Sequence, residues 1–301
     1  MNPPTQPTEP GRPGRKLGPI SENAGPTHRA WLEQLRQAYQ ASGLTLQQLE
    51  NTTGWSRSKI SELLRAAGRY PRWEFIRDLL NALGWPLASV EMLRRMWVQA
   101  AREANKRTVW INDCVLKDLR PGQPPLDFSA FQHLHRPVYH AYTSTFLRRP
   151  ADARRAVDDV FNLLLILWDE ALESENPERF AWQLLRGTVL ERTPQADGHP
   201  ALAEAAFDTL ALHRTEGVEA RFRQIEESLS LFEQLRRLPE AQLDVMVLLH
   251  LRGQSETATA DVLGLSLASV RSTARHARRN LFSRLYPDRT AQEGHPGDLD
   301  H

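Results

Sequence analysis

The chain has 301 residues, of which 41% are hydrophobic and 25% charged, a composition typical of soluble globular protein and sufficient for two or three domains. Its single cysteine, Cys114, excludes an internal disulfide framework, and no apolar run is long enough to cross a bilayer, so we expect a cytoplasmic protein without membrane contact. The net charge of +1 combines a basic first third with an acidic middle, which favours nucleic acid as a partner of the first part and protein as a partner of the second.

Residues 1–27 are rich in proline, glycine and charge. Such a segment buries too little apolar surface to order itself, so we expect a disordered tail. Its first residues contain no apolar stretch of the kind that a secretory signal needs.

Five helices are predicted between residues 28 and 107, and the second and third form a helix-turn-helix. Thr45 and Gln48 fit a capping box at the start of the second helix, and Gly54 supplies the turn. Ser56 fits the cap of the third helix, which Ile60 and its apolar neighbours turn inward.

The run from residue 44 to residue 84, LTLQQLENTTGWSRSKISELLRAAGRYPRWEFIRDLLNALG, resembles the lambda-repressor-like, Cro-type (XRE family) DNA-binding domain. The resemblance implies that the third helix reads bases and that two arginines after it lie near phosphates. Arg57 is the strongest candidate for a guanine contact, because its guanidinium can bond two acceptors on one base edge. Cro-type domains often pair on two half-sites, so a homodimer is possible. A protein-docking module remains an alternative for this domain. The implied DNA-binding residues are Ser56, Arg57, Ser58, Lys59, Glu62, Arg69 and Arg72.

Residues 120–125, RPGQPP, predict a domain boundary, and residues 126–192 follow helical spacing. The run from Leu163 to Leu167 is apolar nearly all round, which indicates burial on more than one side, with a docking surface for a large partner as the alternative.

The order of elements in residues 126–192 resembles sigma-70 region 2, through Asp152, Val157, Asp159, Val160 and Phe161. The family uses this helix to grip RNA polymerase, so the polymerase core is an expected partner. The next helix carries one arginine, Arg186, and Gly187 where DNA melting needs aromatic rings and cations, so we expect no promoter opening by this domain alone. The implied polymerase contacts are Asp159, Phe161, Leu164, Leu165 and Trp168.

Residues 193–225 are predicted to be a linker with a short helix at about residues 201–212, and residues 226–286 form a second helix-turn-helix domain before a polar tail at 287–301. Ser255 and Ser266 fit N-caps on either side of Gly264. The helix after Ser266 has a one-sided basic charge that suits a phosphate backbone. Its arginines are Arg271, Arg275, Arg278, Arg279 and Arg284.

This domain resembles sigma-70 region 4, especially that of the extracytoplasmic-function branch. In the family the domain reads the −35 promoter element. Together, the resemblance and the basic helix give as DNA-binding candidates Ser269, Arg271, Ser272, Thr273, Arg275, Arg278 and Arg279. The resemblance lies in Leu238-Pro239, Gln242, Val245, Leu248, Gly253, Ser255, Leu263-Gly264, Ser266, Val270, Arg271-Ser272 and Ala277-Arg278.

No phosphate-binding loop, cysteine-based zinc spacing or nucleophile elbow occurs in the sequence, so we expect neither an enzyme nor a cofactor. His133 and His140 share a helix face while His135 points elsewhere, which favours ordinary histidines over a metal site.

The sequence therefore predicts an all-α, multidomain protein that binds double-stranded promoter DNA, contacts RNA polymerase and is associated with the nucleoid. A sigma-like factor and a promoter-bound regulator both fit, and the regulator is favoured. The alternative is an adaptor that sequesters a sigma factor, the polymerase core or another regulator without reading DNA.

Overall fold

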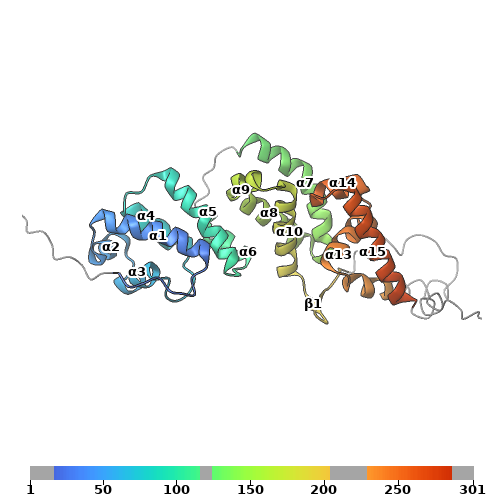
Figure 1. The fold of residues 1–301 in the computed structure, drawn as a ribbon, viewed down its shortest axis with the longest axis horizontal. Coiled ribbons are helices and arrows are strands. Elements are labelled where there is room, and N and C mark those ends of the chain that lie inside the picture. Colours follow the sequence, from blue (N-terminus) through green and yellow to red (C-terminus); the bar gives the residue numbers. More distant parts are fainter. Residues whose placement is uncertain (1–16, 116–123, 204–228, 287–301) are drawn as a thin grey trace, which may run out of the picture. The chain divides into compact units, whose positions relative to one another are not determined.

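The computed structural model describes residues 17–115, 124–203 and 229–286, which are almost entirely helical (Figure 1). The chain divides into two compact units, unit 1 (Met1–Leu119) and unit 2 (Arg120–His301). The all-α, multidomain prediction is confirmed. No described helix combines the length and the apolar character that crossing a membrane requires.

Unit 1 contains the five predicted helices and a sixth that was not predicted. The sixth, α6, lies beyond the expected boundary at residue 107 and packs against α4 and α5. Three buried tryptophans, Trp31, Trp73 and Trp97, anchor the core between α1, α4 and α5. The helices are α1 (Pro26–Ser42), α2 (Leu46–Thr53), α3 (Arg57–Leu64), α4 (Trp73–Ala82), α5 (Leu87–Glu103) and α6 (Thr108–Val115).

The predicted caps of the first helix-turn-helix are present. The Thr45 hydroxyl accepts the backbone N–H of Gln48, and the Gln48 side chain accepts the backbone N–H of Thr45. Gly54 ends α2 with φ of 75°, a left-handed conformation that glycine adopts without strain. Ser56 accepts the backbone N–H of Lys59 and thereby fixes where α3 begins.

The expectation of a disordered tail over residues 1–27 is wrong for its last part. Arg36 donates to the Gly18 carbonyl at 2.9 Å, and the Ser21 N–H donates to the Arg65 carbonyl at 2.8 Å. Backbone groups of this segment are therefore satisfied by α1 and by the end of α3, which a count of apolar residues does not anticipate.

In unit 2, four helices within residues 126–192 pack against a second group of helices within residues 229–285, which ends in the long helix α15. The segment 229–236 is also helical, and the chain between α13 and α14 closes as a π-helical turn, η2. The elements are α7 (Leu126–Phe146), α8 (Pro150–Ile166), α9 (Trp168–Glu173), α10 (Pro177–Arg192), β1 (Gln195–Ala196), β2 (His199–Pro200), α13 (Glu240–Met246), η2 (Val247–Leu251), α14 (Glu256–Leu263) and α15 (Leu267–Leu285).

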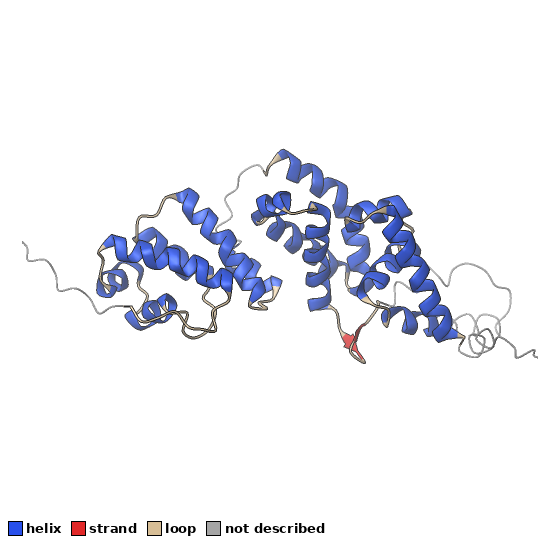
Figure 2. Cartoon of the chain, in the orientation of Figure 1, coloured by secondary structure: helices blue, strands red, loops and turns tan. Residues whose placement is uncertain are grey.

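A short β-hairpin stands where the sequence predicted only a linker (Figure 2). Asp197 and Gly198 turn the chain with φ of 52° and 75°, and the pair Asp-Gly is a common hairpin signal that the linker reading overlooked. Residues 201–203 are not helical, and the rest of the predicted helix at 201–212 lies outside the described residues.

A buried polar network joins the two helical groups of unit 2. The Asp244 carboxylate of α13 accepts the Tyr142 hydroxyl at 2.7 Å and the Trp182 indole N–H at 3.1 Å. The Arg186 guanidinium lies 3.0 Å from the same carboxylate. Burial raises the pKa of Asp244, and Arg186 and these hydrogen bonds oppose that rise. The segments expected as separate domains, 126–192 and 226–286, thus share a buried contact.

The burial of His135 predicts a pH-dependent stability of unit 2. Its ring lies 4.2 Å from the Phe131 ring centroid, and burial lowers its pKa below 6.5, with Glu178 and Asp261 opposing. Because the unfolded chain then binds the proton more readily, stability is complete above about pH 6.5 and is lost as the pH falls towards the folded pKa.

We therefore expect hydrogen exchange of the α7–α10 amides to show a lower free energy of unfolding at about pH 5.5 than at about pH 7.5. The His135→Phe variant is expected to reduce this difference. An unchanged pH dependence in the variant would contradict the assignment.

Candidate nucleic-acid interface

Helix α3 separates an apolar face from a polar one. Ile60, Leu63 and Leu64 are buried against unit 1. The seven predicted DNA-binding residues of this domain are all exposed, five of them at or on α3 and two after it. They are Ser56, Arg57, Ser58, Lys59, Glu62, Arg69 and Arg72.

Three of these cationic side chains have a partner within unit 1: two pair with a carboxylate and one lies over an aromatic ring. The Arg57 Nε lies 3.1 Å from a Glu50 carboxylate oxygen of α2. The Lys59 ammonium lies 5.4 Å from the Trp55 ring, within cation–π range. Arg72 pairs with Asp113 of α6 at 2.8 Å, so the unpredicted sixth helix steadies a candidate phosphate contact.

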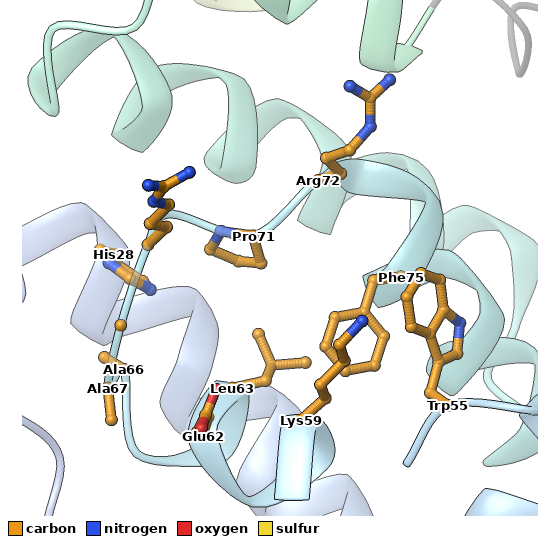
Figure 3. A pocket seen from close by; sticks show the side chains of 12 residues that line it. His28, Trp55, Lys59, Glu62, Leu63, Ala66, Ala67, Pro71, Arg72 and Phe75 are labelled. Carbon is orange, nitrogen blue, oxygen red and sulfur yellow. The ribbon is translucent and has the colours of Figure 1, made fainter.

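A pocket of ≈ 350 Å³ opens beside α3 (Figure 3). Trp55, Leu63 and Phe75 give it apolar walls, and Lys59 extends along the two rings. Its charged lining residues are Lys59, Glu62, Arg69 and Arg72, all of them predicted DNA-binding residues. A hollow with more cations than acids suits the sugar-phosphate backbone of a duplex seated on α3.

Helix α15 has the same two-sided construction. Val270, Ala274, Ala277 and Leu281 are buried, and Ser266 caps the helix by accepting the Ser269 N–H at 3.1 Å. Thr273 is half-buried, which places it at the edge of the exposed face. The other predicted residues are exposed: Ser269, Arg271, Ser272, Arg275, Arg278 and Arg279.

An acid of the preceding helix also holds the first arginine of α15. The Arg271 Nε donates to a Glu256 carboxylate oxygen of α14 at 2.7 Å. A terminal nitrogen of the Arg278 guanidinium lies 3.5 Å from the Nε2 atom of His250. Burial, and then the positive charge of Arg278, lower the pKa of His250. The ring is therefore uncharged at neutral pH and leaves the basic face of α15 to its arginines.

Three of the five residues expected to contact polymerase are in the core. Phe161, Leu164 and Trp168 are buried, and the Trp168 indole donates to Asp127 at 3.1 Å. Leu165 is half-buried, and Asp159 pairs with Arg192 at 2.6 Å. The expectation that this set forms a contact surface is wrong for Phe161, Leu164 and Trp168, because other helices of unit 2 bury all three side chains.

Helix α10 packs on one side against α7, α8 and α9 and on another against α14, and it keeps an exposed face. Trp182 and Arg186 face the Asp244 network, and α14 packs on the same helix. Its clearly exposed positions are Arg179, Gln183, Gly187 and Glu191. This face has no aromatic side chain to stack on an unpaired base.

Sequence reasoning missed Glu50, Glu256 and Asp244. The two glutamates lie 7 and 15 residues before the arginines that they hold. The sequence did contain one signal for these ion pairs: each helix-turn-helix has a glutamate in its first helix, Glu50 in α2 and Glu256 in α14. Among the described residues, no group of three or more histidine, cysteine or acidic side chains could hold a metal ion.

Comparison with protein families assigns both motifs. Residues 32–93 match a family described as a helix-turn-helix domain, and residues 228–281 match a family described as sigma-70, region 4. No curated protein and no solved structure matches the chain. The chain therefore joins a helix-turn-helix domain to a sigma-70 region 4 domain, the combination of a DNA-binding transcription regulator.

Proposed function

We propose that the chain is a promoter-bound regulator that reads duplex DNA with α3 and α15 and contacts RNA polymerase through its sigma-like unit 2. The observation that carries the proposal is a contrast between helices. The faces of α3 and α15 that carry the predicted DNA contacts are exposed and basic, whereas the exposed face of α10 has no aromatic ring, since Trp182 is buried and Phe180 is half-buried. Reading a duplex needs an exposed basic face, and strand opening needs exposed aromatic rings, which the exposed face of α10 does not have.

The match of residues 228–281 to sigma-70 region 4 supports a polymerase contact. The resemblance of residues 126–192 to region 2 supports the same partner. The proposed function needs no homodimer, since each chain already carries two recognition helices.

Arg57 and Arg271 supply the test of duplex reading. A duplex selected from a random-sequence library with the full chain serves as the probe. Replacing either arginine with alanine is expected to weaken binding to this duplex by about 1–3 kcal/mol and to relax the base preference at one position. Unchanged affinity and preference in both variants would contradict duplex reading and favour the adaptor.

Transcription in vitro with the polymerase core separates a regulator from a sigma factor. We expect the chain to bind the core in a pull-down but to give no start-site-specific transcript unless another sigma factor is added. A start-site-specific transcript made with this chain and the core alone would show that the chain is a sigma factor and would overturn the proposal of a promoter-bound regulator. Absence of core binding would overturn the polymerase contact while leaving duplex reading intact.

A further inference from the structure

The same ion pair occurs in both helix-turn-helix motifs. In unit 1 Glu50 of α2 holds the Nε of Arg57, and its second carboxylate oxygen lies 3.4 Å from the Arg57 backbone nitrogen. In unit 2 Glu256 of α14 holds the Nε of Arg271. The motifs differ in sequence and lie in different units, so the pairs are two independent observations.

The carboxylates engage the guanidinium on one edge. A guanidinium has five N–H donors, and an end-on bidentate contact with guanine uses those of the two terminal nitrogens. Glu50 and Glu256 contact the Nε atoms of Arg57 and Arg271, at 3.1 Å and 2.7 Å. A contact at Nε restrains the guanidinium and leaves the donors of the two terminal nitrogens for another partner.

Neither pair is a device for stability. The side chains of Arg57 and Glu50 are 62% and 30% exposed, and those of Arg271 and Glu256 are 56% and 44% exposed. Exposed pairs of this kind contribute little to folding. Their position matters instead, because a fixed negative charge beside a recognition arginine weakens its attraction to any phosphate.

We propose that Glu50 and Glu256 are specificity-determining positioning residues, which orient Arg57 and Arg271 for a base edge and suppress their sequence-independent binding to phosphates. The inference rests on the proposed reading of duplex DNA by α3 and α15. It predicts that removal of either acid moves specific and non-specific affinity in opposite directions, which a folding defect cannot do.

The experiment compares the full chain with Glu50→Gln and Glu256→Gln on two probes, the duplex selected by the unmodified chain and a scrambled duplex of the same composition. Each variant is expected to bind the scrambled duplex more tightly and the selected duplex more weakly, so that the specificity ratio falls about tenfold. The salt dependence of binding to the scrambled duplex should steepen by about 0.9 per arginine released. The Glu50→Ala and Glu256→Ala variants, which also remove the acceptor of the Nε–H, should lose more of the selected binding than the glutamine variants.

The controls are Glu33→Gln on α1 and Glu173→Gln at the end of α9, which remove the same charge from exposed positions of the two units. A glutamine variant that behaves like its control, or that loses affinity for both probes together, overturns the inference. If Arg57→Ala and Arg271→Ala themselves leave selection unchanged, the proposed duplex reading fails instead. The two failures are thus distinguishable.

Discussion

Replacing Asp244 with alanine is expected to destabilise unit 2 by about 3–5 kcal/mol, the usual cost of removing one partner from a buried ion pair. The Tyr142 hydroxyl and the Trp182 indole N–H would lose the acceptor that each now has, and both groups are buried. Arg186 would lose Asp244 and keep its contact with Glu240, at 2.9 Å. An orphaned buried donor costs its full desolvation penalty.

Hydrogen exchange of the α7, α10 and α13 amides in the full chain measures this loss within unit 2. The Asp244→Asn variant keeps one carbonyl acceptor and should fall between the unmodified chain and the alanine variant. Asp261→Ala, which removes an exposed acid from α14, serves as the control and should change stability by less than about 0.5 kcal/mol. Equal effects of Asp244→Ala and Asp261→Ala would show that the network contributes nothing.

The Gly264→Ala variant should be destabilised more than a left-handed backbone alone explains. Gly264 has φ of +61°, and an added Cβ would lie 2.2 Å from the Asn176 Oδ1 and 2.6 Å from the Arg179 backbone nitrogen. Asn176 caps α10 by accepting the Arg179 N–H at 2.7 Å, so the crowding falls on a helix start that cannot easily shift.

Gly253 is the matched control, since its φ is +64° and nothing lies within 4 Å of the added Cβ. Both alanine variants carry the strain of the left-handed conformation, about 1–2 kcal/mol. The crowding at Gly264 should add about 1–3 kcal/mol, as other overpacked sites do. Thermal unfolding of the two variants side by side measures the difference, and identical transitions would show that α14 and α10 separate without cost.

The features that sequence foretold are local. Thr45, Ser56, Ser255 and Ser266 each cap a helix by a bond to a residue three positions later, so the whole interaction lies within one short window. The exposed basic faces of α3 and α15 follow in the same way, because helical periodicity assigns each side chain to a face.

The features that sequence did not foretell depend on distant partners. Asp244 meets Tyr142 and Trp182 across separations of 102 and 62 residues, which no periodicity encodes. Similarly, helical spacing showed that Phe161 and Leu164 belong to one strongly apolar helix. It could not show whether a partner protein or the same chain covers them, and in the structure the same chain does.

The two recognition helices have different sequences, with consequences for the DNA sites that this chain selects. Two identical readers related by a twofold axis fit a palindrome, which looks the same from either end. Helices α3 and α15 begin with Arg57-Ser58-Lys59 and Leu267-Ala268-Ser269, so the sequences that they prefer differ. If the proposed function holds, a DNA site that both helices contact is therefore asymmetric, with different sequences in its two halves. A single chain bound to it would mark one direction along the double helix, as the start of a transcript does.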